Sequence, residues 1–304
     1  MTRRIALLLA CTAAAPAAAG CGATFHGRGL RVVATTTQLG DFVRQVGGDR
    51  VALVTILHPN TDPHEYEPRP RDVEAVAKAK VLFESGAGLD AWMGKVVARS
   101  GGHPRVVELW GAIPVRRGGD PHWWHNPVNA EAAVGAIRDA LTRADPSGRA
   151  AYAAAAARYV ARLRRLDAAI RACMARIPPA QRVLVTDHDA FGYFAARYGI
   201  RIAGAVFPSQ TTQAQASARG VSRLVALIRR EHVRAVFPET SLNASLARAI
   251  ASQSGASSRY ELYGDTLGPA GSPGATYAGM ERANADAIAR GLTGGRVRCG
   301  RYGG

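Results

Sequence analysis

The sequence predicts an α/β protein in which one long helix joins two lobes, each built on a parallel sheet. Short apolar, β-branched segments alternate with amphipathic segments in residues 30–145, and the same alternation returns in residues 180–304. This alternation is typical of parallel strands that are covered by helices on both faces. The intervening residues 146–179 show a helical pattern only, so we expect them to form a linker helix between the two lobes.

The first lobe shows four apolar strand signals, at residues 30–35, 51–57, 81–83 and 106–109. Between these strands, apolar residues recur with helical spacing at residues 39–46 and 73–77. A longer helix is expected after the last strand, over residues 129–144. Gly47 and Gly48 follow the first helical pattern, as glycine commonly does at the end of a helix. The order of strands and helices is that of a parallel sheet.

The linker is expected to be one continuous helix. Pro146 stands near its start and Pro178-Pro179 ends it, positions that suit proline. One apolar stripe runs along the segment, formed by Tyr152, Tyr159, Leu163, Leu166, Ile170, Cys173 and Ile177. At 1.5 Å per residue the helix would be about 46 Å long. That length exceeds what one small lobe requires, so the helix should run along both lobes.

The second lobe repeats the alternation of the first. Strands are expected at residues 183–186, 200–206, 235–238 and 261–263, and helices at residues 191–198, 221–230, 242–252 and 277–292. The two halves share this architecture without sharing sequence. We therefore expect a second parallel sheet with its own helices.

The N-terminus predicts export. Arg3 and Arg4 precede an apolar run that ends before residue 21, so residues 1–20 are typical of a signal peptide and too short for a membrane span. Ala18-Ala19-Gly20-Cys21 resembles a bacterial lipobox, which implies a lipid on Cys21 and a tether over residues 21–29. We expect an extracytoplasmic protein anchored to the outer face of the cell membrane. The alternative is an ordinary secretion signal that contains a cysteine.

The chain is strongly basic, with a net charge of +16 at pH 7. Its arginines are scattered among alanine and glycine rather than gathered in the basic stripe that nucleic acid requires. An exported protein also rarely meets nucleic acid. We therefore expect no nucleic-acid partner, and we expect a monomer.

Two cysteines remain beyond the signal segment and Cys21. Cys173 and Cys299 form an even pair in an oxidising compartment, where disulfides persist. They either pair, tying the C-terminal tail to the body of the protein, or stay as free thiols. The sequence does not measure their separation, so both alternatives stay open.

Three histidines and one aspartate occupy positions where a metal could be held. Ligands of open α/β sheets bind beyond the carboxyl ends of the strands. His64, His188 and Asp265 follow predicted strands, and His122 lies in the loop before the 129–144 helix. Three imidazoles and one carboxylate, two from each lobe, suit tetrahedral Zn²⁺. Taken singly, each histidine is more often a helix cap or a surface group with a hydrogen bond than a metal ligand.

Five motifs, in order along the chain, resemble the zinc and manganese solute-binding proteins of ABC importers (cluster A-I). They are Asp-Pro-His-Glu-Tyr-Glu-Pro at 62–68, Asp-Pro-His-Trp-Trp-His-Asn-Pro at 120–127, His-Asp-Ala-Phe-Gly-Tyr-Phe at 188–194, Phe-Pro-Glu at 237–239 and Leu-Tyr-Gly-Asp-Thr-Leu at 262–267. The resemblance implies two lobes joined by a long helix and a metal bound in the cleft between them. It also implies that the metal is delivered to a permease with its ATPase, and that the chain is not an enzyme.

The same resemblance implies roles for individual residues. His64, His122, His188 and Asp265 would be the metal ligands. Manganese-preferring members place a carboxylate where His188 stands, so this imidazole favours zinc, and a manganese-specific protein is the alternative. Binding should then weaken as the pH falls through the histidine range near 6.5.

Three further residues are tied to this site less directly. Glu239 resembles an acid near the cleft and is expected to orient a ligand imidazole; otherwise it is a surface acid. The family's common Trp-Leu-Asp-Pro is Trp124-His125-Asn126-Pro127 here, which removes an acid and makes His125 an alternative ligand. His58, at the end of a strand, could belong to the site or face solvent.

Two enzyme classes compete with this interpretation. Gly86-Ala87-Gly88-Leu89-Asp90-Ala91 fits a dinucleotide fingerprint after a strand, with Glu108 further on, and would indicate an extracytoplasmic NAD-dependent oxidoreductase. Against this alternative, NAD is scarce outside the cell, and the motif lies in the third strand–helix unit rather than the first. A zinc hydrolase keeps an open position for water, and four protein ligands leave none.

Overall fold

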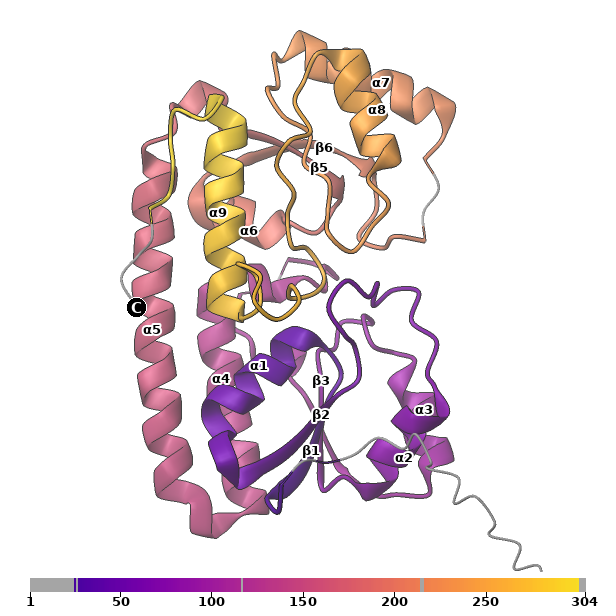
Figure 1. Ribbon diagram of the computed structural model, residues 1–304, viewed down its shortest axis with the longest axis vertical. Coiled ribbons are helices and arrows are strands. Elements are labelled where there is room, and N and C mark those ends of the chain that lie inside the picture. Colours follow the sequence, from indigo (N-terminus) through magenta and orange to yellow (C-terminus); the bar gives the residue numbers. More distant parts are fainter. Residues whose placement is uncertain (1–24, 26, 116, 214–215, 301–304) are drawn as a thin grey trace, which may run out of the picture.

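The structure, a computed structural model, describes residues 25, 27–115, 117–213 and 216–300. Figure 1 shows two lobes stacked along the long axis, with the helix α5 (Arg149–Ala175) running beside both. Two parallel sheets, one in each lobe, form the centres of the lobes. The predicted signal segment and Cys21 lie outside the described residues. No described helix has both the length and the apolar character that crossing a membrane requires.

The N-terminal lobe is built on a four-stranded parallel sheet in the order β2-β1-β3-β4. These strands are β1 (Leu30–Ala34), β2 (Val51–Thr55), β3 (Val81–Glu84) and β4 (Arg105–Glu108). Alternate residues of β1 face opposite sides of the sheet, as strand geometry requires. Val32 packs into one core with α1 (Thr37–Gly47) and α4 (Pro127–Ala144). Val33 packs into a second core with α2 (Pro70–Lys78) and α3 (Met93–Ser100).

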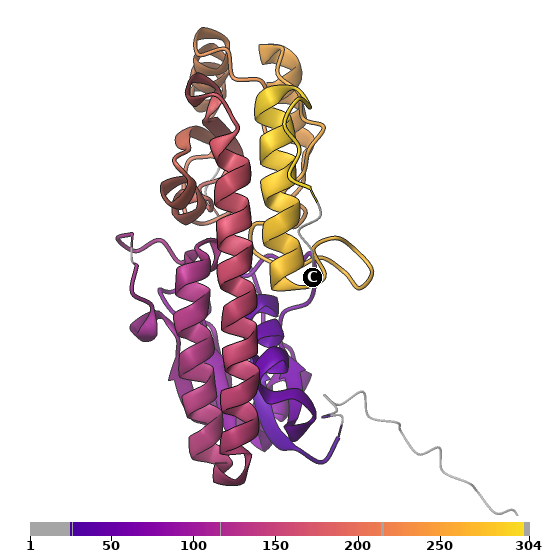
Figure 2. The ribbon, with the colours of Figure 1, turned by 90° about the vertical axis from the view of Figure 1, so that its left-hand side faces the viewer.

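Helix α5 connects the two lobes and packs against elements of each. It is somewhat shorter than the sequence indicates, because Pro146–Gly148 form a separate 3-10 turn before it. Its 27 residues give a length of about 40 Å. The predicted stripe is its buried face, which meets α1 and α4 in the N-terminal lobe and α6 (Gly192–Tyr198) and α9 (Tyr277–Thr293) in the C-terminal lobe. Figure 2 shows α5 in front of both lobes.

The C-terminal lobe contains a smaller sheet than the sequence predicts. Among the described residues of this lobe, only β5 (Val183–His188) and β6 (Arg201–Phe207) pair as full strands. The strands expected at residues 235–238 and 261–263 appear as isolated parallel bridges, which pair Thr186 with Phe237, Ala235 with Ser257 and Glu239 with Leu262. Pro238 has no N–H to donate, and the N–H of Glu239 after it is bonded to the side chain of Asp187. Helices α7 (Ala218–Arg230) and α8 (Ser245–Ser254) cover one face of this lobe.

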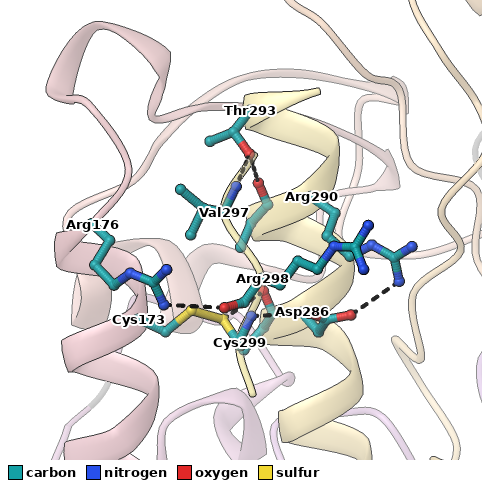
Figure 3. Close-up of a disulfide and its surroundings, with 10 residues drawn as sticks. Cys173, Arg176, Asp286, Arg290, Thr293, Val297, Arg298 and Cys299 are labelled. Atoms are coloured by element: carbon teal, nitrogen blue, oxygen red, sulfur yellow. Dashed lines mark hydrogen bonds and ion pairs between the residues drawn. A yellow bond between two sulfur atoms is a disulfide. The ribbon is translucent and has the colours of Figure 1, made fainter. Parts of the chain in front are cut away.

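A disulfide connects the C-terminal segment to α5 (Figure 3). It joins Cys173 to Cys299, whose Cα atoms lie 5.5 Å apart. Nearby, Arg176 donates a hydrogen bond to the carbonyl of Arg298, and the amide of Cys299 donates one to Asp286 in α9. The segment after α9 is therefore held to both α5 and α9. The domain boundaries at residues 30, 146 and 180 stay a prediction.

Candidate metal site

The structure brings His64, His122, His188 and Asp265 together between the two sheets. His64 lies in the loop after β2, and His122 immediately precedes the 3-10 turn Trp123–His125. His188 is the last residue of β5, and Asp265 lies in the connection that leads to α9. One ligand atom from each residue lies within 4.8 Å of every other. His122, His188 and Asp265 are fully buried, while His64 keeps slight exposure.

The separations between these atoms match the edges of a small coordination polyhedron. His122 Nε2 lies 3.4 Å from His64 Nε2 and 3.3 Å from His188 Nε2. The Oδ1 atom of Asp265 lies 3.3 Å from His122 Nε2, and its Oδ2 atom lies 3.5 Å from His188 Nε2 and 3.8 Å from His64 Nε2. A tetrahedron with metal–ligand bonds of about 2.0–2.1 Å has edges of about 3.3–3.4 Å. The four residues can therefore surround one tetrahedral ion with small adjustments.

The imidazoles of His122 and His188 are oriented by carboxylates on their far sides. Nδ1 of His122 lies 2.8 Å from Asp120 Oδ1, and Nδ1 of His188 lies 2.9 Å from Glu239 Oε1. A neutral imidazole that donates from Nδ1 to a carboxylate keeps the lone pair on Nε2 for a metal. The predicted role of Glu239 agrees with this geometry. Asp120 lies against His122 as Glu239 lies against His188, and sequence reasoning missed it.

A repeated local motif carries the signal for Asp120. His64 and His122 are each the third residue of an Asp-Pro-His segment. In both segments the aspartate accepts the main-chain N–H of the histidine, at 2.9 Å from His64 N to Asp62 and 3.0 Å from His122 N to Asp120. Such Asx turns fix the backbone two residues after the aspartate. The repeat of Asp-Pro-His could have identified both aspartates as supports of ligands.

The turn that carries Asp265 is held mainly by the N-terminal half of the chain. The side chain of Gln38 donates to the carbonyl of Asp265 at 2.9 Å, and Trp124 and His125 each contact the carbonyl of Gly264 at 3.1 Å. Two residues later, Leu267 N donates to Thr37 Oγ1 at 2.8 Å. Asp265 comes from the second half of the sequence, as predicted, but its position depends on the first half.

The carboxylate of Asp265 has no ordinary hydrogen-bond partner. Both of its oxygens are buried and, among the described residues, have no hydrogen bond of ordinary geometry; Nε2 of His122 and Nε2 of His188 lie 3.3 and 3.5 Å away. A buried carboxylate without such partners is costly unless a cation compensates its charge. Its surroundings therefore fit a bound cation.

His125 and His58 are the two alternative ligands that the sequence offers. Both ring nitrogens of His125 face acceptors, Glu281 Oε1 at 2.8 Å and the Gly264 carbonyl at 3.1 Å. Its ring stacks on Phe191 with centroids 4.5 Å apart. His58 lies 2.8 Å from the guanidinium of Arg71, outside the group of four. The structure thus places His125 in a supporting position and His58 away from the site.

In the metal-free protein, burial and the neighbouring charges shift the pKa values of the site residues in opposite directions. Burial lowers the pKa of His64 to about 4, although the charge of Asp265 acts in the other direction. Burial also opposes protonation of His122 and His188, but the hydrogen bond to Asp120, the charge of Glu239 and the nearby Asp265 outweigh it and raise both pKa values. Burial acts against ionisation of Asp265, yet the charge of His188 holds its pKa well below the usual range.

Comparison with known proteins identifies the family. Residues 32–291 match the model of the ZnuA family, described as the zinc-uptake complex component A, periplasmic. This match spans most of the chain. The chain belongs to the ZnuA family. The resemblance seen in the sequence motifs is therefore confirmed.

Individual members of this group are similar over nearly their full lengths. The manganese-binding lipoprotein MntA of Halalkalibacterium halodurans is 33% identical over 286 residues, which cover 91% of this chain and 94% of MntA. The iron-binding protein YfeA of Yersinia pestis is 31% identical, with 86% of both chains covered. The structure of the periplasmic zinc-binding protein TroA of Treponema pallidum matches with a TM-score of 0.82 and 30% identity, covering 88% of this chain and 99% of TroA.

These matches confirm the predicted fold class and the general function. The ZnuA family protein described here has the two-lobed α/β fold of TroA. It is a metal-binding component of an ABC-type metal importer. The names of its relatives include manganese, iron and zinc, so family membership leaves the metal open.

The dinucleotide-like motif of this ZnuA family chain has a different role in the structure. The main-chain N–H groups of Ser85 and Gly86 donate to the carboxylate of Asp90, at 2.6 and 3.0 Å. A dinucleotide fingerprint presents such groups to a pyrophosphate at the start of a helix. Here an internal carboxylate takes them, and α3 begins only at Met93. The geometry therefore does not support a pyrophosphate site.

Proposed function

We propose that this protein captures Zn²⁺ outside the cytoplasm and delivers it to the permease and ATPase of an importer. His64, His122, His188 and Asp265 would bind the ion, and Asp120 and Glu239 would orient two of the imidazoles. The observation that carries the proposal is the set of three imidazoles and one carboxylate whose ligand atoms all lie within 4.8 Å of one another. This donor set suits tetrahedral zinc.

The choice of zinc over manganese depends on His188. Manganese favours oxygen ligands and higher coordination, whereas imidazole suits zinc. The ring of His188 is fully buried and already oriented by Glu239. Four protein donors also leave no open position for a catalytic water, which supports transport rather than hydrolysis.

Metal competition tests the choice of zinc. Purified protein would be titrated with Zn²⁺ and with Mn²⁺ against a chromophoric chelator, beside His188→Asp and the control His103→Ala, an exposed histidine away from the site. We expect zinc to bind at least 100-fold more tightly than manganese. His188→Asp should narrow that ratio, and His103→Ala should not change it. Equal affinity for the two metals in the unaltered protein would reject the zinc proposal.

We also propose that a lipid on Cys21 holds the protein at the outer face of the membrane. The lipobox-like sequence before Cys21 supports this location, and the similar MntA is named a lipoprotein. Incorporation of a labelled fatty acid into the expressed protein tests it, with Cys21→Ser beside the unaltered chain. Label in the unaltered protein alone is the expected result. Equal labelling of both would show that Cys21 is not the anchor.

A further inference from the structure

A cavity of about 600 Å³ opens beside the metal site, and His64 forms part of its wall. Its other walls include Trp92, Lys95 and the turn at Ala87 and Gly88 from the N-terminal lobe. Gln210 and Thr211 border it from the C-terminal lobe. Pockets of 300–1,000 Å³ are the usual size for small-molecule ligands. Because His64 is the one slightly exposed metal ligand, the cavity adjoins the metal site at its accessible side.

The charge of the cavity wall favours an anion. Lys95 lines the cavity, and no acidic side chain does so among the described residues. Lys95 also has no carboxylate partner within ion-pair distance in the described part of the chain. The aromatic walls add no competing polar group, because Trp92 Nε1 donates to the carbonyl of Pro63 and the hydroxyl of Tyr66 donates to Asp72.

The Gly86-Ala87-Gly88 turn supplies further donors at the same wall. All three residues adopt positive φ angles, 87°, 52° and 82°, and alanine rarely does so. Asp90 accepts the N–H groups of Ser85 and Gly86. For Ala87 and Gly88, which line the cavity, no acceptor is found among the described residues. These two N–H groups therefore have no acceptor in the described part of the chain, and their residues line the same cavity as Lys95.

We propose that this cavity binds a small polycarboxylate anion of the kind that chelates divalent metals. Several carboxylates would match the ammonium group of Lys95, the free N–H groups and the amide of Gln210. An α-amino acid fits less well, because its ammonium group would find no acidic side chain there. That the anion would carry the metal to His64 rests on the proposed zinc site. That the anion binds in the cavity does not depend on that site.

Isothermal titration of the metal-free protein with citrate tests the proposal. We expect one citrate per chain and weaker binding at high salt, since the attraction is partly electrostatic. Lys95→Gln should weaken citrate binding about tenfold, because a charged hydrogen bond is lost. Ala91→Trp, at an exposed position on the wall, should abolish it by filling the cavity. Lys80→Gln, an exposed lysine outside the cavity, is the matched control and should bind as the unaltered protein does.

Titration of each variant with free Zn²⁺ separates the two proposals. Lys95→Gln and Ala91→Trp should bind one zinc with unchanged affinity, which also shows that they are folded. Two results would reject the polycarboxylate site alone. One is zinc binding by a protein that does not bind one citrate per chain, and the other is equal citrate affinity of the unaltered protein and Lys95→Gln. Citrate binding by a protein that fails to bind zinc would reject the proposed function alone.

Discussion

The side chain of Gln38 in α1 donates a 2.9 Å hydrogen bond to the main-chain carbonyl of Asp265, 227 positions further along the chain. Together with the contacts of Trp124 and His125 to Gly264, it holds the Asp265 turn against the N-terminal lobe. Three of the four proposed ligands are therefore supported from that lobe, and His188 alone lies on the C-terminal sheet.

Replacement of Gln38 should weaken metal binding without removing a ligand. Gln38→Ala leaves the buried carbonyl of Asp265 without its donor, which costs about 1–3 kcal/mol. We expect zinc affinity to fall by about tenfold and the rate of zinc release to a chelator to rise. Gln45→Ala, in the same helix, is the control and should behave as the unaltered protein. Unchanged release from Gln38→Ala would show that the Asp265 turn does not depend on this contact.

Asp120 should contribute to metal affinity through His122. Loss of a carboxylate that orients a ligand imidazole commonly costs 10–100-fold in affinity. We expect Asp120→Asn, which keeps an acceptor but loses the charge, to show the smaller loss and Asp120→Ala the larger. Asp139→Asn, on the exposed side of α4, serves as the control. Equal zinc affinities across this series, measured by chelator competition, would exclude a positioning role for Asp120.

Zinc affinity should begin to fall at a higher pH than ordinary histidines would cause. Despite burial, carboxylates raise the pKa of His122 and His188 in the metal-free protein, so zinc must displace protons there even above pH 6.5. Burial lowers the pKa of His64 to about 4, so this residue competes only in more acidic solution. Calorimetry in buffers of different ionisation enthalpy should detect proton release on zinc binding at pH 7. No release at pH 7 would contradict the raised pKa values.

The disulfide should contribute substantially to stability. Cys173 and Cys299 are 126 residues apart, and closing such a long loop restricts the unfolded chain. We expect the double substitution Cys173→Ser and Cys299→Ser to lower the free energy of unfolding by about 2–5 kcal/mol, measured by urea denaturation. Unaltered protein treated with a thiol reductant should show the same loss. A double variant as stable as the oxidised protein would show that the bond does not stabilise the fold.

The sequence predicted the fold class because its signals are local. Apolar periods and the prolines near residues 146 and 178 indicated parallel sheets and a long helix, and the comparison with TroA confirms that architecture. The C-terminal strands were overestimated, because residues 235–238 have strand composition but Pro238 has no N–H to donate and the side chain of Asp187 takes the N–H of Glu239. Apolar composition alone could not reveal that the segment pairs only at single residues.

The supports of the site were harder to predict because they depend on long-range contacts. The proposed ligand set followed from motifs that the family resemblance brought together. Gln38, by contrast, lies in an ordinary amphipathic helix, and nothing near it in the sequence points to Asp265. His125 was an alternative ligand in the sequence, whereas its contacts with Glu281 and Gly264 become visible only in the folded chain.

The coordination of bound zinc is the most direct test of the central claim. X-ray absorption at the zinc edge, on protein loaded with one equivalent of zinc, reports the number and type of donor atoms. We predict four nitrogen or oxygen neighbours at about 2.0–2.1 Å, with the outer-shell scattering of three imidazoles, and of two in His188→Ala. A shell of six oxygen atoms, or the same imidazole count in both proteins, would contradict the site proposed here.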